Sequence, residues 1–271
     1  MMKKFLKFVL VGFMFMLSGC SGSSSYSDLT IMDGVEIGIE EYGIAFRSGS
    51  DMTDKVNKIT DQLFKDGTIS DIAAKYDLTN QLVSEFKVVE QQDIDSESDY
   101  QYLKDKGNIV IGITDFKPMD YRDENGEWIG FDADYAKKVC EQLGLKPEFL
   151  EINWDTKEVA LKTKQIDCIW NGMTITDAIK NTADVTGAYI KNYQVVVVKD
   201  SSFTSLESLK GKVIVAESGS AGETAAKADQ YLSIGYKPVE SQTEALLQVK
   251  SGAADACVID FVMAKSLVGN K

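Results

Sequence analysis

The chain of 271 residues contains no histidine. Catalysis by a histidine base and metal binding by histidine ligands are therefore excluded. Acidic residues outnumber basic ones by 42 to 29, which gives a formal net charge of −13 at pH 7. Because nucleic-acid-binding surfaces need a stripe of basic residues, we expect no nucleic-acid partner. A net negative charge instead fits a soluble, well-hydrated body.

Cysteine is also scarce, with four residues, and a CxxC spacing is absent. Cys140 lies in a helical pattern, whereas Cys168 and Cys257 lie in apolar strand patterns. These three residues predict buried free thiols that pack as small hydrophobic groups, with a disulfide as the alternative outside the cytoplasm. Without histidine partners or paired cysteines, we expect neither a metal nor a cofactor.

A long hydrophobic run is missing as well, because the apolar stretch 9–17 is too short to cross a bilayer as a mature helix. Three lysines precede this stretch, and the sequence LSGC follows it and ends at Cys20. This pattern resembles a bacterial lipobox, although a plain secretory signal with a chance cysteine would look similar. We therefore expect a signal peptide over residues 1–19 and, over residues 20–28, a lipidated Cys20 with a Ser/Gly-rich tether.

Strand and helix patterns alternate along the rest of the chain. This alternation predicts an α/β protein with parallel sheets, in which ligands bind at the carboxyl ends of the strands. The expected strands are 35–39, 42–46, 108–113, 149–152, 166–170, 193–199, 212–216, 238–239 and 256–259. The expected helices are 52–65, 69–76, 133–143, 155–164, 206–210, 223–231, 243–250 and 261–267. Residues 78–106 include an acidic stretch with few apolar residues and predict a linker.

The stretch QIDCIWNGMTIT, residues 165–176, organises the interpretation. Residues 166–170 predict a short buried strand that stops at Asn171 and Gly172, after which Thr174 offers a hydroxyl and a backbone N–H group. In open α/β sheets, this edge is where ligands bind. An ordinary turn after a strand is the alternative interpretation of these twelve residues.

On those twelve residues alone, the ordinary turn is the preferred interpretation. Six motifs in a fixed order favour the ligand site instead: GITDFKPMDYRDENGEWIGFDADYAKKV, EINWD, QIDCIWNGMTIT, QVVVVKDSSFTSLESLKGK, ESGSAGETA and ACVIDF. Together they resemble the solute-binding proteins of polar amino-acid ABC transporters, over nearly all of residues 29–271. The resemblance implies a type II periplasmic-binding-protein fold, in which two Rossmann-like α/β lobes are joined by two crossing strands. It also implies that a monomer captures a small amino-acid-like ligand outside the cell and delivers it to permease subunits in the membrane. The lipid on Cys20 would anchor the protein to that membrane.

The order of the chain departs from that family. Residues 41–76 match what the family carries at its C-terminus, but here they stand before GITDF, so the chain looks circularly permuted by a natural or an engineered rearrangement. Lobe 1 would then be residues 43–192, with the linker 78–106 inside it, and lobe 2 would be residues 29–42 plus 193–271. The two chain ends, near Tyr26 and at Lys271, should lie close together on lobe 2, because cutting a loop and joining nearby termini preserves packed lobes.

The resemblance also assigns ligand-binding roles. Asp260 would receive the α-ammonium group, and capping of the last helix is its simpler role, which is compatible with binding. Thr174 would offer its hydroxyl to the ammonium and its N–H group to the carboxylate, while Asn171 and Gly172 line the strand end.

Five further residues receive roles or alternatives. Ser220 and Ala221 open a helix whose N–H groups attract an anion, unless they form an ordinary Gly-rich turn. Phe116 and Trp154 would sandwich the ligand's side chain, with core packing as the alternative. Asp115 would reach a polar side-chain head, or it is a solvated loop charge.

One residue of the family pattern is missing. Ile179 stands where the family usually has an arginine that clamps the α-carboxylate. Lys180 could supply a point charge instead, or the carboxylate could rest on backbone N–H groups, or the ligand could lack a free α-carboxylate. We favour the backbone N–H groups, because a shift of one position turns the side chain of Lys180 about 100° away.

Two other functions compete with transport. An enzyme on the same scaffold, such as a dehydratase or a lyase, would need a positioned acid and base, for which Asp115 and Asp260 are the candidates. A sensory ligand-binding domain would need a transmembrane helix and an output domain, and the expectation that neither follows Lys271 disfavours it. We therefore expect a binding protein and not an enzyme.

Overall fold

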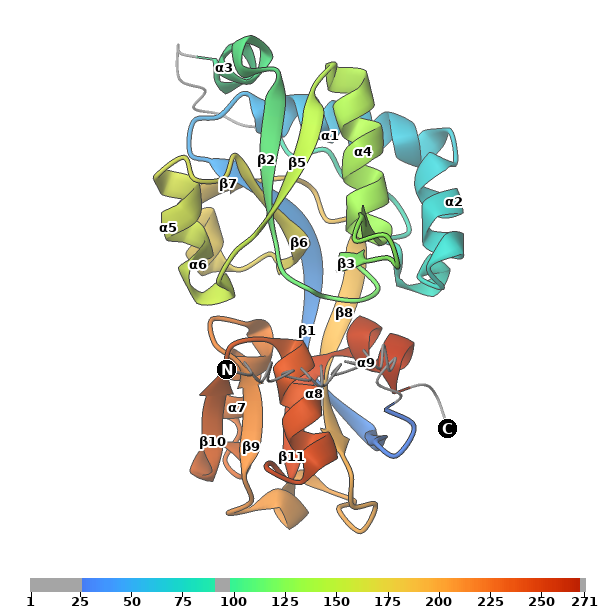
Figure 1. The fold of residues 1–271 in the computed structure, drawn as a ribbon, viewed down its shortest axis with the longest axis vertical. Coiled ribbons are helices and arrows are strands. Elements are labelled where there is room, and N and C mark those ends of the chain that lie inside the picture. The colour runs from blue at the N-terminus through green and yellow to red at the C-terminus, as the bar shows by residue number, and fades with distance from the viewer. Residues whose placement is uncertain (1–25, 91–97, 269–271) are drawn as a thin grey trace, which may run out of the picture.

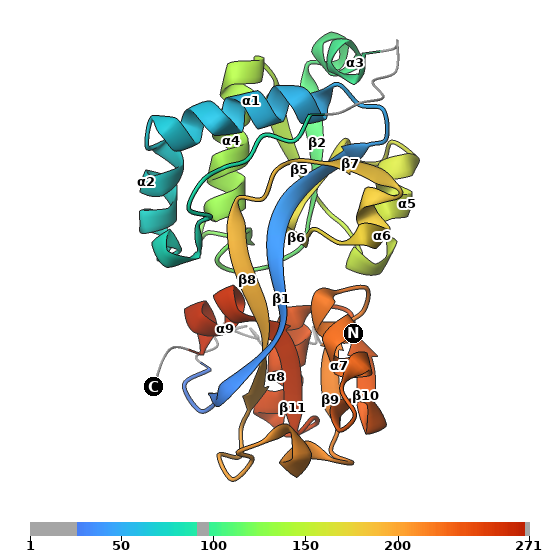
Figure 2. The same cartoon turned by 180° about the vertical axis from the view of Figure 1, so that it is seen from behind.

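The computed structural model of the chain describes residues 26–90 and 98–268 (Figure 1). The predicted signal peptide, the lipidated Cys20 and the terminal Lys271 lie outside the described residues. Figures 1 and 2 show two bodies, here called the upper lobe and the lower lobe, joined by two long strands. These strands are β1 (Thr30–Arg47) and β8 (Ile190–Val198), which run antiparallel to each other.

The other elements alternate much as predicted. The remaining strands are β2 (Asn108–Ile113), β3 (Tyr121–Arg122), β4 (Trp128–Ile129), β5 (Lys146–Glu151), β6 (Cys168–Thr174), β7 (Ala183–Val185), β9 (Ile214–Glu217), β10 (Tyr236–Val239) and β11 (Ala256–Asp260). The α-helices are α1 (Met52–Lys65), α2 (Thr68–Lys75), α3 (Asp99–Lys106), α4 (Phe131–Leu143), α5 (Lys157–Lys162), α6 (Asp177–Lys180), α7 (Ala221–Ala228), α8 (Gln242–Ser251) and α9 (Phe261–Leu267). Among the residues described, no helix is long and apolar enough to cross a membrane.

One sheet runs through both lobes in the order β10-β9-β11-β8-β1-β6-β2-β5. In the upper lobe, β2 is parallel to β5 and to β6, and in the lower lobe, β9 is parallel to β10 and to β11. The carboxyl ends of these parallel strands point toward the gap between the lobes (Figure 1). The topology therefore brings the ligand-binding edges of two half-sheets to face each other.

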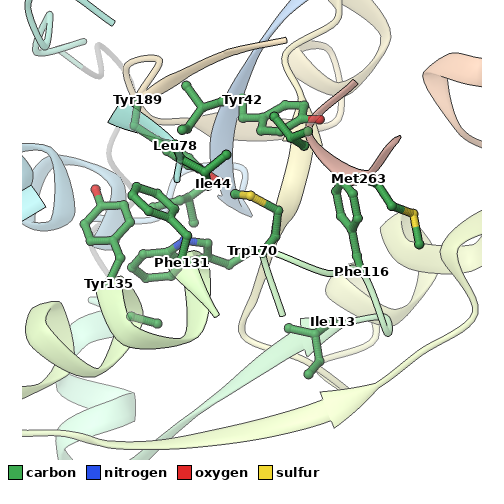
Figure 3. Close-up of a cluster of buried hydrophobic side chains, with 14 of the residues drawn as sticks. Tyr42, Ile44, Leu78, Ile113, Phe116, Phe131, Tyr135, Trp170, Tyr189 and Met263 are labelled. Carbon is green, nitrogen blue, oxygen red and sulfur yellow. The ribbon is translucent and has the colours of Figure 1, made fainter. Parts of the chain in front are cut away.

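Alternation along β6 gives the upper lobe a core on both faces of its sheet. Cys168 and Trp170 join the cluster that includes α4, whereas Ile169 and Met173 join the cluster that includes α5. Figure 3 shows Trp170 among aromatic side chains, and the ring centroids of Trp170 and Tyr135 lie 4.8 Å apart in an edge-on arrangement. All three described cysteines are free and buried, which confirms that prediction.

The predicted end of the central strand is wrong. Strand β6 does not stop at Asn171 and Gly172 but continues to Thr174, because its last residues pair with β1, with Thr174 opposite Tyr42. For the same reason, the two short strands expected at 35–39 and 42–46 form one long strand, β1. Pairing between segments so distant in the sequence cannot be predicted from local patterns.

Two predicted helix caps also differ. Asp132 lies inside the first turn of α4, because Gly130 occupies the N-cap position. The buried Asp132 carboxylate instead accepts hydrogen bonds from the Gly172 N–H group at 2.6 Å and from the Tyr189 hydroxyl at 3.0 Å. Asp260 does occupy the N-cap position of α9, but its side chain makes no capping hydrogen bond.

The stretch predicted as a linker is partly ordered. Residues 99–106 form α3, which begins with a Ser98 cap whose hydroxyl accepts from the Gln101 N–H group. The Arg47 guanidinium holds this helix through an ion pair with Asp99 at 3.2 Å. The acidic composition concealed this helix, since its partner lies about fifty residues away in the sequence.

Candidate functional site

A small cavity lies between the facing strand ends, and we call it the interlobe cavity. The upper lobe lines it with Thr114, Phe116, Trp154, Asn171, Gly172 and Thr174, and the lower lobe with Glu217, Ser220, Ala221, Gln242 and Asp260. The free space inside is about 20 Å³, roughly the space of one water molecule. A pocket of about 290 Å³ shares Trp154, Thr174, Ser220 and Ala221 with this lining, so the free space between the lobes continues beyond the cavity.

Eight of the nine ligand-binding residues predicted from the sequence line this cavity. The exception is Asp115, whose exposed side chain is not part of the lining, and whose carbonyl oxygen accepts from the Thr243 hydroxyl at 3.4 Å. Partial burial and the nearby Glu151 carboxylate raise the pKa of Asp115, while Arg122 and Lys117 oppose them.

The sequence interpretation missed three lining residues, Thr114, Glu217 and Gln242. Thr114 follows β2 directly, Glu217 ends β9, and Gln242 begins the helix after β10. All three stand at or just beyond the carboxyl end of a parallel strand. The rule that drew attention to Thr174 would have identified them too, had it been applied to every strand.

Asp260 is the best-supported carboxylate of the cavity. Asp260 is the last residue of β11, and it is 6% exposed. Oδ1 accepts from the Tyr42 hydroxyl at 2.5 Å, and from the amides of Asn192 at 2.5 Å and Gln194 at 2.9 Å. Oδ2 accepts from the Gln242 amide at 2.5 Å. All of these donors are neutral, so the carboxylate is well oriented but its charge has no counter-ion among them.

Glu40 on β1 lies behind Asp260 and shares its amide donors. Its Oε1 accepts from Asn192 at 2.5 Å and from Gln194 at 2.8 Å, and its Oε2 accepts from the Thr174 hydroxyl at 2.8 Å. Burial, followed by repulsion from the Asp260 carboxylate, raises the pKa of Glu40 well above its ordinary value. A proton on Glu40 therefore relieves the repulsion between the two carboxyl groups.

Glu217 is the second carboxyl group that lines the cavity. It is 4% exposed, and its Oε1 atom is buried without a hydrogen-bond partner. Burial, followed by the Asp260 charge, raises its pKa to about 8, while Lys157 and a hydrogen bond with Gln242 oppose this rise. Among the described residues, Asp120 Oδ1 and Asp132 Oδ1 are also buried carboxyl oxygens without a partner, but only Glu217 of the three lines the cavity.

Lys157 on α5 is a cation whose charge acts on Glu217. Its ammonium donates to the carbonyl oxygens of Trp154 at 3.2 Å and of Gly219 at 3.0 Å, and the second bond reaches across to the lower lobe. Burial lowers its pKa, and surrounding carboxylates, Glu158 first, oppose this effect. No ion pair within the described ranges 26–90 and 98–268 includes Lys157, Glu217 or Asp260.

No arginine faces the cavity. Ile179 is buried and packs in the apolar cluster of Trp154 and Met173. Lys180 is exposed and lines a separate groove outside the cavity, which confirms that it faces away. Both arginines of the chain are engaged elsewhere, Arg47 with Asp99 and Arg122 with the Gly126 carbonyl at 2.7 Å.

The predicted N–H donors are only partly available. Ser220 caps α7 through its hydroxyl, which accepts from the Glu223 N–H group at 3.1 Å. The Ser220 N–H group already donates to the Glu217 carbonyl oxygen, at a long 3.3 Å. Ala221 is the first residue of the helix, so its N–H group has no acceptor within the helix and lies at the positive end of the helix dipole.

Two half-sheets that close over a cavity define a two-lobed ligand-binding protein of the type II periplasmic-binding-protein fold. Residues 109–256 match the family model of bacterial extracellular solute-binding proteins, family 3, so the chain belongs to this family. The matched segment covers more than half of the chain and includes every residue that lines the cavity except Asp260.

Named relatives agree with this assignment. The chain is 31% identical over 164 residues to the arginine-binding extracellular protein ArtP of Bacillus subtilis (strain 168), which covers 59% of this chain and 64% of ArtP. It is 28% identical over 151 residues to ABC transporter arginine-binding protein 1 of Escherichia coli (strain K12), covering 56% and 61%. The chain thus spans less than two thirds of the length of these curated relatives.

Solved structures show the same fold. The arginine-bound form of truncated ArgBP from T. maritima is 34% identical and superposes with a TM-score of 0.59, covering 62% of this chain and 80% of that chain. The ancestral amino acid-binding protein AncCDT-1, described as a precursor of cyclohexadienyl dehydratase, is 35% identical with a TM-score of 0.56, covering 59% and 73%.

Proposed function

We propose that this protein captures an amino acid or a similar small zwitterion between its two lobes and delivers it to the permease of an ABC transporter. The observation that carries the proposal is the Asp260 carboxylate, which is oriented by four neutral donors at the interlobe cavity and has no counter-ion there. The names of the relatives, which include arginine-binding proteins of ABC transporters, support the same class of ligand.

The lining offers each part of such a ligand a partner. Asp260 would accept the ammonium group, and the Thr174 hydroxyl, which donates to Glu40, retains lone pairs for a second ammonium hydrogen. The Ala221 N–H group would donate to a carboxylate. Phe116 and Trp154 line the cavity from the upper lobe and would cover the apolar part of the ligand.

Closure of the lobes would bury the ligand, since β1 and β8 are long strands about which the lobes could hinge. The hydrogen bond from Lys157 to the Gly219 carbonyl oxygen joins the lobes in the closed form. Gly219 also fits closely there, because a Cβ atom on it would lie 2.8 Å from the Asp155 Cα atom.

The alternative of an enzyme receives less support from this arrangement. The acid and base expected for it were Asp115 and Asp260, and Asp115 does not line the cavity with Asp260. Glu40, the carboxyl group closest to Asp260 in its hydrogen bonding, lies behind the lining and contacts Thr174 instead.

The permuted order, with the lobe limits 43–192 and 29–42 plus 193–271, is part of the proposal. The family match begins at residue 109, so β1, α1 and α2 lie outside it, although they complete the sheet and cover the upper lobe. The arrangement of the elements supports this order, because β1 begins and α9 ends in the lower lobe (Figures 1 and 2). Moving residues 29–90 behind residue 268 through a short linker should give a folded protein that binds the same ligand, and loss of folding would contradict the permutation.

Thermal denaturation with the twenty amino acids, cystine and small amines tests the binding function, because a ligand that binds only the folded state raises the melting temperature. We expect a rise with at least one compound, and a much smaller rise in the Asp260→Ala protein. No rise with any compound would reject the proposal. Radiolabelled fatty acid would separately test the proposed lipid anchor at Cys20, and sedimentation the proposed monomer.

A further inference from the structure

We propose that Glu217 forms a second cation subsite in the interlobe cavity, so that the ligand carries a positively charged group besides the ammonium assigned to Asp260. This inference deepens the proposed function and rests on it. It narrows the ligand class from amino acids and similar small zwitterions in general to those that bring a cationic side chain or a second ammonium group.

The unpartnered oxygen of Glu217 is the first argument. Its Oε1 atom has no hydrogen-bond donor, although the residue is 4% exposed and lines the cavity. Asp260, the other lining carboxylate, has four side-chain donors. A buried acceptor left open beside a fully supported one is the arrangement expected where the ligand supplies the missing donor.

The balance of charge is the second argument. Glu40, Glu217 and Asp260 are all buried at or directly behind the lining. The charge of Lys157 acts on Glu217, but its ammonium already donates to two carbonyl oxygens. The proton held on Glu40 removes one of the three charges, and a second cationic group of the ligand would replace the proton held on Glu217 and stabilise its ionised form.

The outer rim of the cleft is also negatively charged. A recess of about 650 Å³ between the lobes is lined by Asp155 from the upper side and by Glu240 and Glu244 from the lower side. Ser218, the residue after Glu217, lines it too, so this recess adjoins the subsite. Acidic walls on both sides attract cations and would raise their local concentration at the opening.

A different role for Glu217 predicts the opposite pH dependence. If its protonated carboxyl group donated a hydrogen bond to a neutral ligand, affinity would fall as pH rises and the proton is lost. If it accepts a cation, affinity rises with pH, because binding then releases the proton. The groups that face Glu217 are Asp260 from β11, Lys157 from α5 and Gln242 from α8, and Glu217→Gln separates its titration from theirs.

Isothermal titration calorimetry between pH 6 and 8.5 tests the proposal with matched probes, L-lysine against L-norleucine and L-arginine against L-citrulline. We expect one charged probe to bind at least about tenfold more tightly than its neutral partner at pH 8.5. Its affinity should fall by up to about tenfold per pH unit below pH 8, with about one proton released on binding. Glu217→Gln should bring the ratio near one and abolish the pH dependence. Glu207→Gln, an exposed change in the same lobe, should alter neither.

The outcomes separate this inference from the proposed function. Equal binding of charged and neutral partners, or a ratio that survives Glu217→Gln, overturns the second subsite and leaves amino-acid capture standing. Binding of 1,4-diaminobutane alone, lost in Glu217→Gln, supports the subsite and rejects an amino acid as ligand. If none of the five probes binds, the second subsite is overturned, and the thermal screen of all the amino acids alone decides the proposed function. Because proton release is measured on the unmodified protein, the test does not depend on whether the variant folds.

Discussion

Glu217→Gln should change how the stability of the unliganded protein depends on pH. The pKa of Glu217 rises from the ordinary value of 4.5 to about 8, with burial as the first cause. The folded state therefore holds a proton on this group that the unfolded state has lost, throughout the window between pH 4.5 and 8. Because the folded state binds more protons there, the free energy of unfolding falls as pH rises.

The magnitude follows from about 1.4 kcal/mol for each pH unit. Across the window, Glu217 would remove up to about 4 to 5 kcal/mol from the free energy of unfolding, and less if the lobes open and hydrate the carboxylate first. The Glu217→Gln protein keeps a neutral side chain of the same shape and should escape this loss. Its stability should therefore be closest to that of the wild type near pH 5 and exceed it most near pH 8.

Urea unfolding at intervals of half a pH unit from pH 5 to 8.5 would measure the difference between the two proteins. Asp132, whose buried carboxyl group has its pKa raised to about 7, adds to the same trend but is present in both proteins and cancels in the difference. Glu207→Gln is the matched control, since the same change is made at an exposed position. Parallel pH profiles for the wild type and Glu217→Gln would refute the burial argument for Glu217.

Four further predictions concern the site and the anchor. Asp260→Ala should weaken ligand binding by about one to two decades, since a charge-assisted hydrogen bond contributes about 1.5–3 kcal/mol, and calorimetry showing unaltered affinity would remove Asp260 from the site. Gly172→Ala should destabilise the protein by about 1–3 kcal/mol in thermal unfolding, because φ is +54° and the new Cβ would lie 2.5 Å from the Phe116 Cε1 atom; an unchanged melting temperature would contradict this. Lys180→Ala should leave affinity almost intact while amidation of the ligand's carboxylate weakens binding, and a large loss from the lysine change would assign the carboxylate to that residue. Cys20→Ala should stop incorporation of labelled fatty acid, and undiminished labelling would exclude the lipid anchor.

The sequence located the residues that line the interlobe cavity better than it predicted the strands that carry them. Thr174 was singled out because parallel strands collect ligand residues at their carboxyl ends, whereas the role of Asp260 came from the resemblance to solute-binding proteins. The continuation of β6 to Thr174 was missed, because those residues are held by pairing with β1, more than a hundred residues earlier in the sequence. Local propensity carries no information about such a partner.

The charged residues of the site were the second feature that local sequence patterns could not predict. Glu40 and Glu217 look like ordinary surface acids in the sequence, and the chain has 42 acidic residues from which to choose. Only the fold shows that both are buried and that their nearest charged neighbour is Asp260. The burial of a charged residue depends on the packing of several elements, so it emerges only from the assembled structure.

The two crossing strands do more than connect the lobes, because their side chains also donate hydrogen bonds to the Asp260 carboxylate. Asn192 and Gln194 on β8 and Tyr42 on β1 all donate to Asp260 Oδ1, which belongs to the lower lobe. Tyr42 lies opposite Thr174 of the upper lobe, and the Thr174 hydroxyl donates to Glu40 on the same strand. The groups that would hold the ligand's ammonium are thus hydrogen-bonded to the very strands about which the lobes would hinge. A cation bound at Asp260 would therefore contact a carboxylate that is hydrogen-bonded to both crossing strands.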